Sequence, residues 1–238
     1  MTSPIEVAVA ARNTARVSHP APRAEQRRRL RKVQDYPLDL TPGQVSGDAP
    51  GVAHAQGVLQ KAQEAWDAIR DAARDSDVPL GALAKQSSAV ADRATRSLAS
   101  AVTTLERQIA HFDGELDNAL SMRVEPALAT EIRAHFRDRP FTDVAQHLDD
   151  PRIASAILTA PAVLSGRTSE EFSRLRDQAE QSLAPDAHRK RAESRRALDT
   201  VTAAVGRFQS VIDSRINEWH RAAAQPGAMM RLGELADA

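Results

Sequence analysis

Residues 80–122 read LGALAKQSSAVADRATRSLASAVTTLERQIAHFDGELDNALSM, and this stretch decides the fold. Its apolar residues recur three, four or seven positions apart. They are Leu83, Val90, Ala94, Leu98, Ala101, Leu105, Phe112, Leu116 and Ala119. Such spacing places one apolar stripe along a helix, and that stripe needs another helix to cover it. We therefore expect a helix on the order of 60 Å long, at 1.5 Å per residue, packed against helical neighbours.

Two further stretches, near residues 52–76 and 185–225, carry the same rhythm. Trp66 and Trp219 lie on these stripes, where they are expected to anchor helix packing or an oligomer interface, and Arg215 takes one seam position of the last stripe. We call the stripe positions the seam. The residues predicted to carry helix packing or an interface are Leu59, Trp66, Ile69, Leu98, Leu105, Val205, Phe208, Ile212 and Trp219.

Residues 124–184 are punctuated by four prolines, with short apolar segments between them. Thr142 is a candidate N-cap for one short helix, and Thr168 with Glu171 forms a capping box that predicts the start of another. We expect a compact subdomain of short helices here.

The fold class expected from these patterns is all-α, because no stretch shows strand-like alternation. The expected architecture is an elongated antiparallel helical bundle or coiled-coil hairpin, with a compact short-helix subdomain and an extended N-terminal arm. The predicted segments are a basic, proline-rich arm (1–51), a long helical hairpin (52–123), the compact subdomain (124–184), a long helix packing back (185–225) and a tail (226–238).

Composition narrows the function classes. The chain has no cysteine, which excludes disulfides, zinc–thiolate sites and thiol nucleophiles. No apolar run approaches the roughly 20 residues that span a bilayer, and Glu6 and Arg12 interrupt any signal-like segment at the start. We expect no membrane contact and no secretion by a signal peptide, with the chain in a cytoplasm or packed into a particle there.

Charge is distributed unevenly although the net charge is zero. Residues 12–32 hold eight basic side chains against Glu25, a local charge of +7. This arm is expected to be a solubilising tail or to dock on a protein or nucleic acid partner, through Arg23, Arg27, Arg28, Arg29, Arg31 and Lys32. A second basic run, 188–196, is interpreted as a solvated helix face or as a contact with nucleic acid or an acidic partner. Neither run contains aromatic residues, so contact with nucleic acid would be to phosphates and nonspecific.

Signatures of catalysis are missing from the sequence. Glu131 with His135 and His111 with Asp113 could each supply two metal ligands, and His147 with the acidic pair 149–150 could supply three, but no HExxH motif or matching second pair exists. No GxSxG elbow, P-loop or GxGxxG occurs. We predict no catalytic residues, no cofactor, no metal and no small-molecule substrate.

The segment DDPRIASAILTAPAVLSGRTSEEFSRLRDQ, residues 149–178, combines an apolar run, a P-x-x-L-S-G turn and a capped helix. The residues that carry this pattern are Pro161, Leu164, Ser165, Gly166 and Thr168. The segment resembles a stretch found in small helical proteins of tailed bacteriophages. The resemblance implies a structural or assembly component of a virion, whose partners are copies of itself or other virion proteins, and it transfers no catalytic residue. Two alternatives are a nucleic-acid-associated coiled coil and a bacterial effector or chaperone-like adaptor.

Overall fold

The computed structural model describes residues 38–40, 45–74 and 78–224. All regular structure in these ranges is helical, which confirms the predicted all-α class. Within the same ranges, no helix is both long and apolar enough to cross a lipid bilayer.

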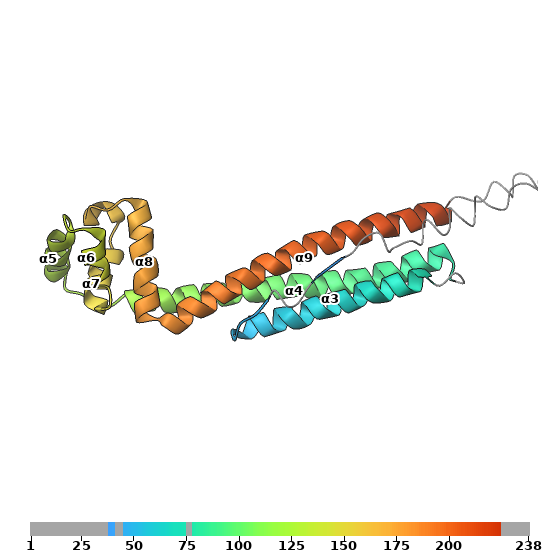
Figure 1. Cartoon of the computed structure of the whole chain (residues 1–238), viewed down its shortest axis with the longest axis horizontal. Coiled ribbons are helices and arrows are strands. Elements are labelled where there is room, and N and C mark those ends of the chain that lie inside the picture. Colours follow the sequence, from blue (N-terminus) through green and yellow to red (C-terminus); the bar gives the residue numbers. More distant parts are fainter. Residues whose placement is uncertain (1–37, 41–44, 75–77, 225–238) are drawn as a thin grey trace, which may run out of the picture. The chain divides into compact units, whose positions relative to one another are not determined.

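Three helices are long: α3 (Pro50–Arg74), α4 (Leu80–Leu120) and α9 (Pro185–Ala224) (Figure 1). The segment between α4 and α9 forms α5 (Pro126–Phe136), α6 (Phe141–Ala145), α7 (Pro151–Leu158), the 3₁₀ helix η3 (Ala162–Ser165) and α8 (Ser169–Leu183). Several of these helices begin at a proline, which fits the first helical position because its missing N–H has no helical partner there.

The ends of the short helices show which capping predictions were right. Thr168 accepts a hydrogen bond from the Glu171 N–H, and the Glu171 carboxylate accepts one from the Thr168 N–H, so the capping box is confirmed. Thr142 as an N-cap is wrong: α6 begins at Phe141, and its cap position is Pro140, with no side-chain cap. Proline at that position already fixes an extended backbone just before the helix, and Thr142 falls inside the first turn.

The structure divides into two compact units, each of which uses part of every long helix. The first unit contains the described residues 38–40, 62–74, 78–95 and 206–224. Its buried apolar residues include Leu40, Trp66, Ile69, Leu83, Phe208, Ile212 and Trp219. Gly81, at the start of α4, lies close enough to Ala223, at the end of α9, that an added Cβ would contact the Ala223 Cβ at 3.6 Å. Further along α4, residues 88–95 line a groove together with the earlier residues 209–220 of α9, so the two helices run antiparallel in this unit.

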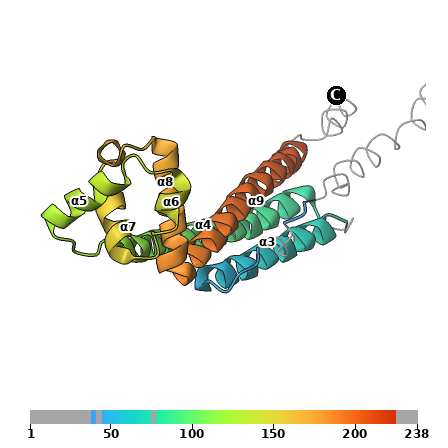
Figure 2. The same cartoon turned by 60° about the vertical axis from the view of Figure 1, so that its left-hand side comes forward.

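The second unit contains residues 45–61 and 96–205. Its long-helix core includes Val52, Leu59, Leu98, Leu105 and Val201, and α5 to α8 surround a cluster that we call the tip core (Figure 2). The buried members of the tip core are Leu120, Phe136, Val144, Leu148, Ala154, Ile157, Leu158, Leu175 and Ala179. The tip core thus joins the end of α4 to the short helices.

The end of the predicted arm lies on the chain's own helices. Leu38, Leu40, Val45 and Ala49 are buried. In the first unit, the Leu40 N–H donates to Gln63 Oε1 at 3.1 Å. Residues 38–40 and 45–49 are therefore part of the packed protein, whereas 1–37 lie outside the described residues.

Three glycines inside the long helices have room for a methyl group. A Cβ added at Gly57, Gly114 or Gly206 would have no neighbour within 4 Å. Because glycine costs a helix about 1 kcal/mol relative to alanine, each Gly→Ala change should raise the free energy of unfolding by about 0.5 to 1 kcal/mol in urea unfolding. Gly166→Ala is the opposing control. Gly166 has a φ of 66°, and its added Cβ would lie 2.8 Å from Arg137 Cγ, so this variant should be destabilised. Equal responses at Gly114 and Gly166 would contradict the described backbone.

Candidate functional site

The predicted site residues fall into two groups, one outside the described residues and one within them. Arg23, Arg27, Arg28, Arg29, Arg31 and Lys32 lie outside the described residues. Of the seam residues, Leu59, Trp66, Ile69, Leu98, Leu105, Phe208, Ile212 and Trp219 are all at most 3% exposed. Val205 is half-buried, and its neighbour Ala204 is buried instead. These residues fill the helical interior of their units, and whether they also form an interface stays a prediction.

A group of linked ionisable side chains lies where α8 turns into α9. Only Ala184 separates Leu183, the last residue of α8, from Pro185, the first of α9. This sharp turn brings the last two turns of α8 against the first two turns of α9. The sequence does not reveal this pairing, because the proline break between the two segments conceals that their side chains face one another.

Glu180 of α8 is the centre of this group and is only 2% exposed. Its Oε1 accepts a hydrogen bond from Arg176 Nε at 2.9 Å, and its Oε2 accepts one from Arg191 Nη2. Arg191 Nη1 also lies 3.3 Å from Asp113 Oδ1, and Arg176 pairs with Asp117. The series Asp117–Arg176–Glu180–Arg191–Asp113 therefore ties α4, α8 and α9 together, and we call it the brace.

The brace keeps its arginines charged. Burial alone would lower the pKa of Arg191, but hydrogen bonds and attraction from Glu180 and Asp113 outweigh burial and raise it above the usual value. The pKa of Arg176 is raised for the same reasons, with Glu180 and Asp117 as its partners. A buried carboxylate with two guanidinium partners has its charge balanced and its lone pairs used.

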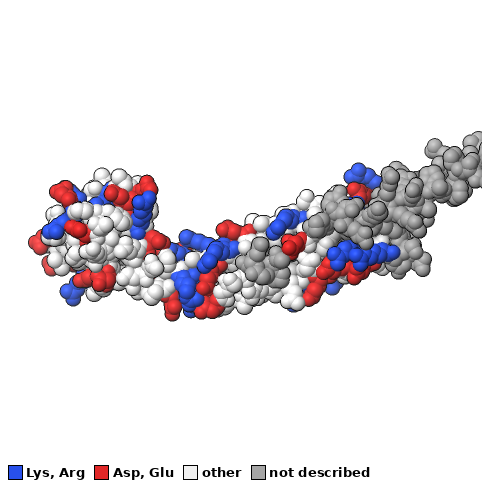
Figure 3. All heavy atoms as spheres, in the orientation of Figure 1, with Lys and Arg blue, Asp and Glu red and all other residues white. Residues whose placement is uncertain are grey.

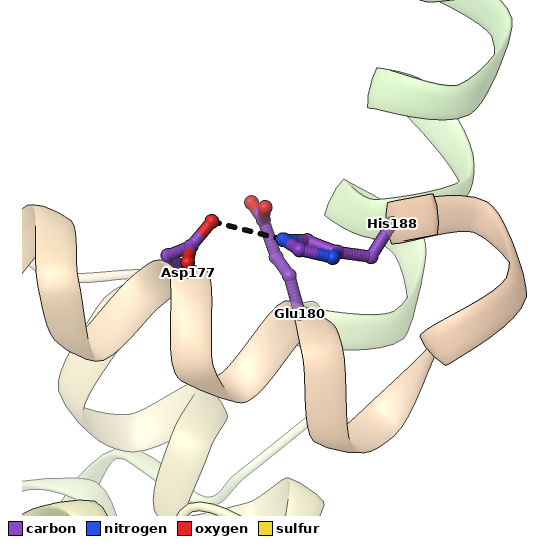
Figure 4. A group of neighbouring side chains, drawn as sticks. All are labelled: Asp177, Glu180 and His188. Carbon is purple, nitrogen blue, oxygen red and sulfur yellow. Dashed lines mark hydrogen bonds and ion pairs between the residues drawn. The ribbon is translucent and has the colours of Figure 1, made fainter. Parts of the chain in front are cut away.

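Three potential metal ligands, Asp177, Glu180 and His188, lie close together (Figure 4). Among the described residues, they are the one group of three His, Asp or Glu side chains whose ligand atoms all lie within 4.8 Å of one another. Three such residues can in general ligate a divalent cation. Here His188 Nε2 is 2.9 Å from Asp177 Oδ1, and both oxygens of Glu180 accept hydrogen bonds from arginines. A cation would have to displace those two guanidiniums or sit beside their positive charge, so the geometry favours a structural role.

A second set of ion pairs anchors residues before α3 to α9. Arg189 binds Asp48 through two hydrogen bonds, of 2.6 and 3.0 Å, and Glu193 at 2.8 Å. Glu193 Oε2 also accepts the Asp48 N–H at 3.1 Å. Several basic side chains of the run 188–196 therefore form ion pairs with acidic residues of the same chain. In Figure 3, basic and acidic side chains are intermingled on the face shown.

Low pH should weaken the ion pair between Asp48 and Arg189. The hydrogen bond from Arg189 lowers the pKa of Asp48 below its ordinary value of 3.8. A lowered folded-state pKa contributes stability above pH 3.8, and this contribution is lost as the pH falls through the folded value. Asp48→Asn should therefore be less stable than wild type at neutral pH. The difference should shrink as urea unfolding is repeated at pH values falling below 3.8.

Asp186→Asn is the matched control for this pH series, because Asp186 makes a longer and more exposed contact with Arg189, at 3.4 Å. It should show little difference at any pH. A difference in the free energy of unfolding between Asp48→Asn and wild type that stays constant as the pH falls would show that the charge of Asp48 does not stabilise the fold.

A groove of about 420 Å³ lies between α4 and α9 in the first unit. Ala91, Ile212 and Ile216 form a buried floor, and exposed Asp92, Asp213 and His220 stand on the rim. The other lining residues are Ser88, Thr95, Gln209 and Asn217. The exposed rim leaves this groove open to solvent.

The turn that follows α7 is held rigidly although it presents apolar side chains. Ser165 Oγ donates to the Ile157 carbonyl at 3.2 Å, and the Arg167 guanidinium donates to the carbonyls of Phe136 and Arg139. Within this fixed turn, Val163 is 76% exposed and Leu164 is 48% exposed.

The arrangement as a whole can brace helices and present a surface. Comparisons of the chain with protein-family models, with curated proteins and with solved structures give no match.

Proposed function

We propose that this chain is a non-enzymatic structural or assembly protein that binds other proteins through surfaces held by its helical frame. The observation that supports the proposal best is the turn at 161–167, which is fixed by hydrogen bonds and still exposes Val163 and Leu164. Exposed apolar side chains on a fixed backbone are typical of docking sites, because little ordering entropy is lost on binding.

The brace supports the same proposal. Its five charged residues link α4, α8 and α9 within the second unit and so favour this one arrangement of the three helices. Residues 149–178 resemble a stretch of helical phage proteins, and on this ground we propose that the chain is a virion component. It would be a capsid-associated protein, a connector protein or an internal protein of the particle. Its partners would be copies of itself or other virion proteins.

Isolation of the chain from its source cell tests this function. A tagged full-length chain should be recovered in a large assembly of constant stoichiometry, as measured by light scattering with mass spectrometry of the co-purifying chains. The tag fused to an unrelated helical protein is the control. Recovery of the chain as a free monomer under conditions in which known assemblies of that cell stay intact would overturn the proposal.

A second candidate function is nonspecific contact with nucleic acid, and the +7 charge of residues 12–32 favours it. If the arm binds phosphates, filter binding to duplex DNA should weaken steeply and log-linearly with salt. A variant with Arg27, Arg28 and Arg29 changed to glutamine should show a shallower salt slope. Absence of binding at low salt would remove this candidate.

A further inference from the structure

We propose that the turn at 161–167 and the end of α5 form one docking surface for an acidic protein partner with an apolar pocket. This inference rests on the proposed function and adds the chemistry of the partner. Val163 and Leu164 would enter the pocket, and arginines around them would face the partner's carboxylates. We call this surface the arginine-rimmed turn; it consists of residues 133–140 and 161–168.

The turn is attached to α5 by contacts on both sides. Arg137 Nη2 donates to the Leu164 carbonyl at 3.4 Å, and Arg167 Nη2 donates to the Phe136 carbonyl at 2.9 Å. Gly166, with a φ of 66°, allows the backbone to reverse directly against the Arg137 side chain. Val163 and Leu164 are therefore presented next to the α5 end by a backbone that hydrogen bonds tie to α5.

Charge around the turn identifies the partner. The two stretches of the arginine-rimmed turn contain Arg133, Arg137, Arg139 and Arg167 against one acid, Asp138. Of the acids that flank these stretches, Glu131, Glu170 and Glu171, Glu170 pairs with Arg174 and Glu171 caps α8 at Thr168. Among the described residues, none of these four arginines has a carboxylate oxygen within 4 Å, whereas the arginines of the brace all do. Arg133, Arg137 and Arg167 donate to carbonyl or hydroxyl oxygens, so their positive charge is not neutralised.

A protein partner fits these features better than nucleic acid or a membrane does. Two adjacent aliphatic side chains contribute nothing to phosphate binding, and the arginine-rimmed turn exposes no Phe, Tyr or Trp that could stack on bases, because Phe136 is buried. An apolar centre with a charged rim is the usual anatomy of a protein–protein interface. Acidic side chains around a partner's pocket would complement the four arginines and speed association.

The test uses the full-length chain and a displayed library of random peptides as the probe. Peptides enriched on wild type should combine Asp or Glu with Leu, Ile or Phe. The double variant Val163→Ser/Leu164→Ser should bind the enriched peptides about tenfold more weakly or worse. Arg139→Glu, which breaks no hydrogen bond of the described structure, should weaken them about threefold to tenfold, with a stronger effect at low salt.

Matched controls separate the surface from general effects. Met122→Ser/Leu128→Ser removes apolar side chains that are 41% and 42% exposed elsewhere, and Arg152→Glu makes the same charge change on α7. Both should leave peptide binding unchanged, and circular dichroism should show that all variants are folded. Equal binding to every variant, enrichment of basic peptides, or failure to enrich any peptide would overturn the proposal.

Two further probes decide between classes of partner. A DNA duplex and vesicles of phosphatidylserine with phosphatidylcholine should not lose binding when Val163 and Leu164 are changed to serine. Loss of DNA or vesicle binding in that variant would assign the surface to phosphates and overturn the proposal. If the chain enters an assembly in its source cell but these peptide results fail, only the docking surface is wrong and the assembly function stands.

Discussion

Trp219→Ala should lower the free energy of unfolding by about 3 to 5 kcal/mol, the range for removing a large buried aromatic side chain. Trp219 is 0% exposed in the core of the first unit, and only 3% of the chain is aromatic. In a core built largely from alanine and leucine, small neighbours cannot move far enough to fill the space of an indole ring. Urea unfolding followed by far-UV circular dichroism measures the loss.

Val163→Ala is the control for this substitution, because Val163 is 76% exposed. Its effect should stay within about 0.5 kcal/mol. Similar small losses in both variants would show that the α9 stripe is not buried, and the helical packing described for the first unit would be wrong.

Glu180→Ala should cost about 3 kcal/mol, because it leaves Arg191 partly buried beside an empty space. The Arg191 side chain is only 12% exposed, and its remaining partner, Asp113, is 3.3 Å away. Glu180→Gln keeps the shape but loses the charge, so it should cost less. Chemical unfolding of both variants gives the two values.

Glu170→Ala on the same helix is the matched control, since Glu170 makes an exposed i,i+4 pair with Arg174. It should change stability by about 0.5 kcal/mol or less.

Zinc added to wild type should not raise the melting temperature, because arginines already occupy both oxygens of Glu180. If Glu180→Ala lost as little stability as Glu170→Ala, the brace would not stabilise the fold. If zinc raised the melting temperature of wild type but not of Glu180→Ala, Glu180 would belong to a metal site.

The long helices could be predicted from the sequence because their signals are local. Apolar spacing marks most of the buried face of α4, where Val90, Ala94 and Ala119 are only half-buried and the other predicted positions are buried. The Thr168–Glu171 capping box marks the start of α8 within four residues. The misplaced seam position has a physical reason. On a helix with 3.6 residues per turn, the positions three and four residues after the buried Val201 lie on either side of the buried line, and in the middle of α9 Ala204 is the one buried while Val205 is half-buried.

The candidate site could not be predicted because its contacts are not local. The brace requires Asp113, Glu180 and Arg191 to meet, and no periodicity connects positions so far apart in the chain. The anchoring of Asp48 by Arg189 is equally distant, and the segment before α3 resembled an extended arm through its prolines and charges. The exposure of Val163 and Leu164 in the turn at 161–167 could not be predicted either, since composition does not reveal which apolar side chains stay uncovered.

Hydrogen exchange of the full chain, alone and in the assembly recovered from its source cell, tests most directly whether this protein works by docking a fixed helical surface. We predict that amides of residues 161–167 and of the end of α5 become more protected in the assembly, while the middle of α4 is unchanged. New protection confined to the α4–α9 groove, with none at 161–167, would contradict the account.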